Sequence, residues 1–528
     1  MSLSAPPREP TRTDRLLAAV GGLLAAYVSL AVADLAAFWV RPEASPVPAV
    51  GGAVVDRTPA ALKDWAIRAF GESDKAVLQL GILLLLGALA VGIGLLALRH
   101  RLLGSAAVGA FGVLGALAAV TRPDSDSAMD AVPSLVGAAA GALLLYVLTG
   151  RLTRGAGAGS GAARADRRSF LVVAASTGLA ATGAAAVARA VGSPVAANAA
   201  ASRAALRLPR PTSPAPAVPP GAQLDVPGIS PFVTPNRDFY RVDTALVVPK
   251  VDADRWQLRL HGSGVRREVT YTLRELMSRP TIERDITLAC VSNEVGGPYV
   301  GNARWLGVSL ADLLRGAGVR PPSEGGPADQ LVARSVDGMT IGTPVEQVMD
   351  GRDALLAFGM NGEPLPFSHG FPVRMLVPGL YGYVSACKWI ESIELTTFDA
   401  YDAYWVPRGW SAEAPVKTQS RIDTPRSFAG PAAGTVMVAG VAWAQHRGIR
   451  RVEVRIDDGP WQEARLAAED SSDTWRQWVH PWEADPGRHT LTVRATDGTG
   501  ATQPEERTGT MPNGAQGWHS VVVTVEGA

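Results

Sequence analysis

The chain has 528 residues, with 50 Lys and Arg against 49 Asp and Glu, so it lacks the strong positive field of a nucleic-acid-binding protein. Its length exceeds the roughly 250–300 residues at which a single core stops growing, and two or more structural units are therefore expected. Its two cysteines, Cys290 and Cys387, form no CxxC pair, which argues against a zinc knuckle or an iron–sulfur cluster.

Apolar runs dominate the first 192 residues. They cover residues 16–40, 76–98, 102–120, 131–149 and 170–191. Lengths of about 20 residues match the hydrocarbon core of a bilayer. A soluble Ala-rich helical bundle is the alternative, but the first two runs lack the polar stripe of a soluble helix. We therefore predict a membrane region over residues 1–192 with about five transmembrane helices.

The positions of the basic residues predict an orientation in the membrane. Basic residues gather before the first run (Arg8, Arg12, Arg15), between the second and third (Arg99, His100, Arg101) and between the fourth and fifth (Arg151, Arg154, Arg164, Arg167, Arg168). The positive-inside rule places these segments in the cytoplasm. Five spans then predict a multi-pass protein of the cytoplasmic membrane, with everything after residue 192 on the outside.

Two further segments of this region have their own interpretations. Residues 59–71, "PAALKDWAIRAFG", could form an amphipathic helix on the membrane surface. Arg167 and Arg168 resemble a twin-arginine export signal, and they are equally explained as two positive-inside arginines next to a span.

The composition and the residue pattern of the rest of the chain change twice. Residues 193–224 predict a Pro/Ala-rich linker. Residues 225–426 mix strand patterns, such as 255–262, with an amphipathic helix over 309–319 that starts at Ser309, which predicts an α+β domain. The domain has no GxGxxG or Walker loop, so a nicotinamide or ATP site is disfavoured. Strand-like segments spaced by turns predict an antiparallel, immunoglobulin-like β-sandwich over 427–528.

Three segments of the sequence, the first of which begins at Cys290, indicate a function for this residue. They are "CVSNEVGGPYVGNARWLGVSLADLL", "NGEPLPFSHGFPVRMLVPG" and "YGYVSACKWIESIEL". Over about residues 230–525 the chain resembles the sulfite oxidase family of molybdenum enzymes, including the C-terminal dimerisation domain of that family. The resemblance implies a molybdenum–pyranopterin cofactor, with Cys290 as the thiolate ligand of the metal. A soft thiolate suits a redox-active transition metal, whereas composition alone favours a buried packing cysteine.

The resemblance also carries over cofactor-binding positions. They are Asn236, Tyr240, Arg241, Ser335, His369, Arg374, Ser385, Cys387 and Lys388. In the family, the positions of His369 and Arg374 grip the pterin and its phosphate, for which a guanidinium fork is well shaped. Lys388 matches a further charge partner, and the backbone of Cys387 is expected to line the same loop.

The chain differs from animal and plant sulfite oxidases near the expected substrate. Met339 stands where those enzymes have a tyrosine, and Asn293 and Glu294 in "VSNEV" replace a more basic segment. Arg304 in "NARW" is the candidate catalytic cation that would compensate.

The resemblance implies oxygen-atom transfer on a small-molecule substrate, with sulfite oxidation as the first candidate. Reduction of a sulfoxide, as in methionine sulfoxide-type reductases, and a non-catalytic envelope binding module are the alternatives. An external electron donor or acceptor, such as a cytochrome or a quinone-linked protein, is expected because the apolar runs contain no His pair for haem. The family also implies a homodimer through the C-terminal domain.

Overall fold

The computed structural model describes residues 11–58, 74–122, 125, 127–154, 160–191 and 194–527. The chain divides into two compact units. The first is Met1–Ala197 with Thr244–Val248, and the second is Asn198–Asp243 with Pro249–Ala528.

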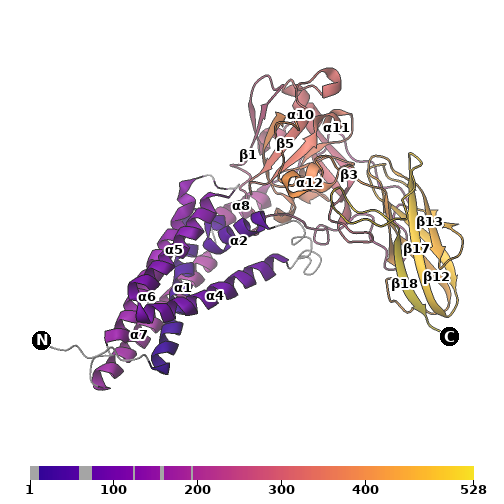
Figure 1. Ribbon diagram of the computed structural model, residues 1–528. Helices are drawn as coiled ribbons and strands as arrows, with labels where there is room; N and C mark the ends of the chain where they lie inside the picture. Colours follow the sequence, from indigo (N-terminus) through magenta and orange to yellow (C-terminus); the bar gives the residue numbers. More distant parts are fainter. Residues whose placement is uncertain are drawn as a thin grey trace. The chain divides into compact units, whose positions relative to one another are not determined.

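The first unit is helical (Figure 1, indigo to magenta). Its helices are α1 (Arg12–Trp39), α2 (Pro46–Arg57), α4 (Asp74–Arg99), α5 (Arg101–Val120), α6 (Val132–Arg154) and α7 (Ser160–Val191). Among the described residues, four stretches are long and apolar enough to cross a membrane: Arg12–Trp39, Val77–Arg99, Arg101–Val120 and Ala128–Thr153. These stretches carry the first four predicted spans.

The remaining predictions for this unit have different outcomes. The predicted fifth span falls within α7; because several side chains of α7 lie outside the described residues, its crossing of the membrane stays a prediction. The predicted surface helix at 59–71 also lies outside the described residues. Helix α2, in the same link, was not predicted from the sequence.

Glycines let the helices of this unit approach one another closely. A Cβ atom built on Gly22 of α1 would lie 2.1 Å from the carbonyl oxygen of Ala90 in α4, and one on Gly94 of α4 would lie 2.1 Å from that of Ala18. Small residues at such contacts are typical of helix packing in lipid, where van der Waals contact drives association.

Gly94→Leu is expected to force α1 and α4 apart. The added side chain has no room, so overpacking should cost about 1–3 kcal/mol in the free energy of unfolding. The measurement is thermal unfolding of the full chain in detergent. Gly92→Leu is the matched control, because a Cβ atom at Gly92 meets nothing within 4 Å; equal effects of the two substitutions would contradict this packing.

The predicted linker is partly ordered. Residues Pro194–Ala205 form helix α8, which is consistent with the high helix propensity of alanine. Ser202 Oγ accepts from Ala253 N–H at 3.1 Å, and Arg203 donates to the carbonyls of Leu365 at 2.8 Å and Pro364 at 2.7 Å. From Asn198 on, the expected linker therefore belongs to the second unit.

Two sheets and short helices build residues 249–418 of the second unit. One sheet has the order β2 (Val269–Thr272), β1 (Gln257–Gly262), β10 (Ile390–Thr396), β5 (Gln330–Ser335) and β6 (Thr340–Pro344). The other runs β3 (Thr281–Ala289), β4 (Val300–Ser309), β7 (Leu355–Met360) and β8 (Glu363–Pro364), and β9 (Arg374–Leu376) also pairs with β7. The helices are α9 (Leu273–Met277), α10 (Leu310–Gly316), α11 (Val345–Met349) and α12 (Gly382–Ser385).

This arrangement confirms the predicted α+β class. Strands β1 and β10 pair parallel, whereas β3, β4 and β7 pair antiparallel. Ser309 caps α10 as predicted, since its Oγ accepts from Asp312 N–H at 3.1 Å. The two sheets enclose one core, in which Trp305 and Phe358 are fully buried.

The C-terminal β-sandwich is also confirmed (Figure 1, orange to yellow). One sheet has the order β11 (Gln419–Thr424), β12 (Gly434–Trp443), β16 (Arg476–Ala484) and β15 (Arg465–Leu466). The other has the order β14 (Gln462–Glu463), β13 (Ile449–Ile456), β17 (Gly487–Asp497) and β18 (His519–Val525). The sandwich begins at Gln419 rather than 427, because β11 pairs with β12 along its length.

His519 joins the two sheets of the sandwich. Its Nδ1 accepts from Ile422 N–H, of the opposite sheet, at 3.0 Å, so the proton of the neutral ring is on Nε2. Burial, and then the positive charges of Arg507 and Arg421, lowers the pKa of His519 to about 4. The ring is therefore neutral at physiological pH.

This lowered pKa predicts a pH dependence of stability. Between about pH 6.5 and about pH 4 the unfolded chain binds a proton that the folded chain does not, so the free energy of unfolding should fall as the pH falls. His519 alone should contribute a loss of about 1–3 kcal/mol across this window. Denaturant titrations of the full chain at both pH values measure it. His519→Gln should lose correspondingly less, and an equal loss in both proteins would contradict the assignment.

Candidate functional site

Cys290 opens the loop that joins β3 to β4. These strands pair with Ala289 opposite Val300, so residues 290–299 close the hairpin. Cys290 N–H donates to Tyr299 O at 2.9 Å, and Cys290 O accepts from Asn293 N–H at 3.1 Å. Cys290 is a free cysteine and is 8 % exposed. The hairpin thus fixes one buried thiol at the end of β3, the first strand in the order of its sheet.

Tyr381 and Tyr240 interact electrostatically with this thiol. Burial raises the pKa of Tyr381 to about 12, and a charge on Cys290 raises it further. Burial first and Cys290 second also raise the pKa of Tyr240. The Tyr240 hydroxyl lies 3.9 Å from a Cβ atom built on Gly382, where α12 begins. Both hydroxyls stay protonated at neutral pH and can donate hydrogen bonds.

Opposing effects act on the pKa of the Cys290 thiol. Burial raises its pKa, while hydrogen bonds from Ser292 and the positive charge of Lys388 lower it in part. A thiol in this position becomes a thiolate readily only when a further positive charge, such as a bound metal ion, is supplied.

Arg374 is buried without an acidic partner among the described residues. It is 5 % exposed and begins β9. One terminal nitrogen donates to His369 O at 3.3 Å, the guanidinium lies 5.0 Å from the Trp305 ring centroid, and the buried Nε has no hydrogen-bond partner. Burial lowers the pKa of Arg374 to about 10. The side chain is still a cation at neutral pH, and a buried unpaired cation calls for an anion.

His369 lies beside this cation. It ends the 3₁₀ turn Phe367–His369, its Nε2 lies 3.0 Å from Asn236 O, and its ring meets that of Phe239 edge-on at 5.6 Å. Burial, and then the charge of Arg374, lowers the pKa of His369 to about 4. His369 is therefore a neutral polar group beside Arg374.

A second positive group surrounds Asp243. Lys388 Nζ donates to Asp243 Oδ2 at 2.8 Å, and Arg241 Nε donates to the same oxygen at 2.9 Å. Lys388 also donates to Ser368 O at 3.4 Å. Two cations therefore share one carboxylate here, and Asp337 lies within electrostatic range of Lys388 and Asp243.

The remaining predicted residues, Asn236, Ser335, Ser385 and Cys387, are buried or hydrogen-bonded within the second unit. Asn236 donates to Met360 O at 3.2 Å and to Glu363 Oε1 at 2.6 Å. Ser335 is 1 % exposed and ends β5. Ser385 is fully buried, and its hydroxyl donates to the carbonyls of Leu380 and Tyr381 at 3.0 Å. Cys387 is buried and its carbonyl accepts from Met375 N–H at 2.8 Å.

The structure does not bring Arg304 to this cluster. Arg304 stands opposite Asp285 in the β3–β4 ladder, and it donates to both carboxylate oxygens at 2.9 and 2.5 Å. Five residues of strand separate Asp285 from Cys290, which is about 17 Å at 3.4 Å per residue. Arg304, which was expected at the reacting centre, is therefore engaged in an ion pair with Asp285.

Three residues near the site were not predicted. Asp243 pairs with Lys388, Tyr381 neighbours Cys290, and Asp337 has its pKa raised by burial while Asp243 and Lys388 act on it electrostatically. Only "RVDT", where an acid follows Arg241 by two residues, offered a sequence signal for Asp243. The other two become neighbours through the fold alone.

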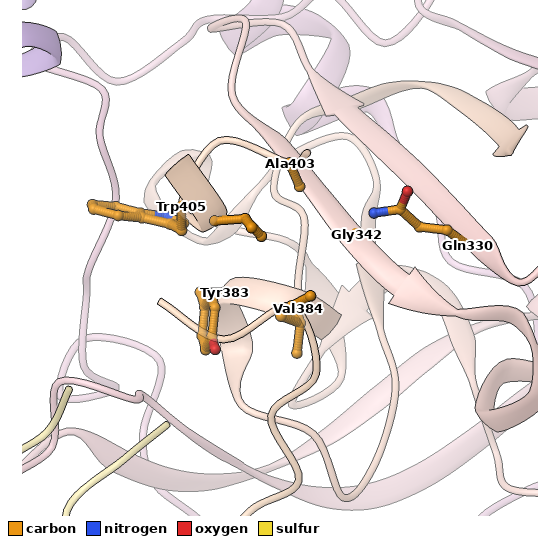
Figure 2. A pocket seen from close by; sticks show the side chains of 8 residues that line it. Gln330, Gly342, Tyr383, Val384, Ala403 and Trp405 are labelled. Atoms are coloured by element: carbon orange, nitrogen blue, oxygen red, sulfur yellow. The ribbon is translucent and has the colours of Figure 1, made fainter. Parts of the chain in front are cut away.

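A small pocket borders α12 (Figure 2). Its lining is Gln330, Gly342, Tyr383, Val384, Ala403, Trp405, Val406 and Ala412. The Tyr383 hydroxyl donates to Ser411 O at 2.7 Å. Since none of the predicted site residues lines this pocket, it is separate from the cluster around Cys290.

Comparison with known proteins shows what this domain is similar to. Residues 245–405 match the family described as oxidoreductase molybdopterin binding domain. Mitochondrial sulfite oxidase of Rattus norvegicus is 29 % identical over 343 residues, which are 56 % of this chain and 62 % of the relative. Residues 245–405 thus form a molybdopterin-binding oxidoreductase domain that is similar to that of the sulfite oxidases.

The chain is also similar to other known proteins. Sulfite oxidase of Gallus gallus is 32 % identical over 310 residues, 51 % of this chain and 64 % of the relative. The chain thus spans less than two thirds of the length of these curated relatives. The crystal structure of the sulfane dehydrogenase SoxCD from Paracoccus pantotrophus is 24 % identical, with a TM-score of 0.48, and covers 56 % of this chain and 84 % of that one.

The residues of the molybdopterin domain fit the cofactor that its family implies. A pyranopterin carries a phosphate, and the orphaned Nε of buried Arg374 offers a donor for it. The positive group of Lys388 and Arg241 adds further donors. Cys290 supplies a thiol within electrostatic range of Lys388, and neutral His369 supplies a ring nitrogen. This donor set suits an anionic, metal-bearing group.

Proposed function

We propose that the chain is a membrane-anchored molybdenum-cofactor oxidoreductase that transfers an oxygen atom to or from sulfur outside the cytoplasmic membrane. The buried Arg374 without an acid partner carries this proposal, because such a cation is costly unless an anion binds it. When bound, the cofactor supplies the two-electron oxygen-atom chemistry. Cys290 would hold the metal, and Arg374, Lys388 and Arg241 would hold the pterin phosphate.

The protein's own residues prepare the reacting centre. The β3–β4 hairpin fixes Cys290, so the ligand does not have to be ordered when the metal binds. Tyr240 and Tyr381 keep their protons and can donate hydrogen bonds to a developing oxyanion. Neutral His369 is held by its contact with Asn236 O, so it would orient the bound cofactor without adding charge.

Sulfite oxidation is the first candidate, since it is the activity that the names of the curated relatives state. Reduction of a neutral sulfoxide is the second, and one observation favours it. Arg304, the expected cation for a dianionic substrate, is held by Asp285 away from Cys290. A site with fewer free cations favours a neutral substrate.

Assays of the molybdenum-loaded protein separate these functions. Sulfite with an artificial electron acceptor tests the oxidase, and sulfoxides with a reduced dye test the reductase. Loaded protein that is inactive in both directions would contradict either enzyme function and favour a non-catalytic envelope binding module.

The orientation and the partners belong to the same proposal. Five spans and the positive-inside rule place the molybdopterin domain outside the cytoplasm, whereas α7 lying on the surface would leave only four spans and place it inside. Protease treatment of intact spheroplasts tests this, because only an external domain is cleaved. Electrons would pass to or from a separate protein, and a dimer through the sandwich stays a prediction of the family resemblance.

A further inference from the structure

The loop that follows Cys290 touches the β-sandwich as well as its own domain. This loop, residues 291–297, closes on itself through Gly297 N–H, which donates to Glu294 O at 2.8 Å. Asn293 Oδ1 accepts from Tyr299 N–H at 2.7 Å. These internal bonds shape the loop, and contacts from the sandwich then fix where it lies.

Arg421 of β11 makes the first of these contacts. One terminal nitrogen donates to Gly297 O at 2.7 Å and the other to Ser230 Oγ at 2.9 Å, while Nε donates to Asp423 Oδ1 at 2.7 Å. Asp423 in turn accepts from Ser230 N–H at 2.9 Å. The Arg421 side chain is 11 % exposed, so its fork is held on three sides in a site largely shielded from water.

His519 of β18 makes the second contact. Its ring lies so close to Gly296 that a Cβ atom on that residue would come within 2.2 Å of it, and Gly296 has a φ of +79°. The ring is fixed by the bond from Ile422 N–H to Nδ1. Gly296 is thus required both by its backbone conformation and by the ring against it.

The sandwich also holds the strand before Cys290. Thr287 of β3 accepts from Gln445 at 2.9 Å through its carbonyl and from Trp475 N–H at 2.7 Å through its hydroxyl. Its N–H donates to Asp473 O at 2.9 Å. Residues on both sides of Cys290 are therefore fixed by the same C-terminal module.

We propose that the β-sandwich positions the metal ligand, and that Arg421 and His519 act as positioning residues that hold loop 291–297 behind Cys290. The module then completes the site of its own chain. The inference rests on the proposed function for the role of Cys290, but the contacts stand without it. This positioning role could not be predicted from the sequence, because Arg421 and His519 lie more than a hundred residues after Cys290.

Hydrogen exchange of the full-length protein without cofactor is the first test. Arg421→Met should speed exchange of the Asn293, Gly297 and Tyr299 amides by about tenfold or more, the scale of lost hydrogen bonds to a charged group. The rate at which a maleimide labels Cys290 should rise with it. Arg494→Met is the matched control: Arg494 pairs with Glu453 at 2.9 Å in the other sheet of the sandwich, and this variant should leave both rates within about twofold.

Arg421→Lys guards against a variant that fails to fold. An ammonium keeps the charge but cannot bond Gly297, Ser230 and Asp423 with one planar fork, so it should restore only part of the protection. In the molybdenum-loaded protein, the Mo(V) electron paramagnetic resonance signal should shift in Arg421→Lys and not in Arg494→Met. Full protection of the loop in folded Arg421→Met would overturn the inference. Wild-type protein that binds no molybdenum would overturn the proposed function and leave the exchange result standing.

Discussion

Cys290→Ser is expected to abolish oxygen-atom transfer in either direction, by at least about a thousandfold, which corresponds to about 4 kcal/mol of transition-state free energy. A serine hydroxyl is hard and keeps its proton, so it cannot replace a soft thiolate on a metal that changes oxidation state. The measurement is the turnover rate of loaded protein with sulfite or a sulfoxide, together with molybdenum content.

The fold should survive this change. Cys290 is bonded through its backbone, to Tyr299 and Asn293, and serine keeps both bonds. The free energy of unfolding of the cofactor-free protein should therefore shift by less than about 1.5 kcal/mol. A fully active Cys290→Ser protein would contradict the assignment of this residue as the metal ligand.

Arg374→Met is expected to have two opposite effects. Cofactor content should fall to a small fraction of wild type, because the phosphate loses its buried guanidinium partner. The cofactor-free protein should gain about 1–3 kcal/mol of stability, since methionine fills similar space without burying an unpaired charge. Pterin and molybdenum analysis measures the first effect, and denaturant unfolding measures the second.

Arg352→Met is the matched control for this prediction. Arg352 has an 11 % exposed side chain and pairs with Asp350 at 2.6 Å, so its loss breaks a satisfied ion pair. This variant should lose stability and keep its cofactor. Arg374→Met protein that retains wild-type pterin content, or that is destabilised as Arg352→Met is, would contradict the account of Arg374 as an anion-binding cation.

Elements with a strong local pattern could be predicted closely from the sequence. The run at 102–120 became α5 (Arg101–Val120), and Ser309 caps α10, because apolar length and capping chemistry act within a few residues. Predictions that depended on the absence of pattern were less accurate. The Ala-rich start of the expected linker forms α8, and the sandwich recruits β11 before the expected boundary.

The site shows the same division. Cys290, His369, Arg374 and Lys388 could be proposed as site residues from short sequence segments, and electrostatic interactions in the folded chain connect them. The partner of Arg304 could not be placed, because which face of β4 it uses and what stands opposite depend on strand register. Arg421 and His519 were out of reach for a related reason: their contacts with the Cys290 loop join segments that no local pattern connects.

Molybdenum and pterin content of the purified full-length protein, expressed in a host that makes the cofactor, is the most direct test of whether this chain is a molybdenum enzyme. We expect stoichiometric molybdenum with pterin, and a Cys290 thiol that resists labelling until the cofactor is removed. Protein that is folded, free of both molybdenum and pterin, and fully labelled at Cys290 would contradict it.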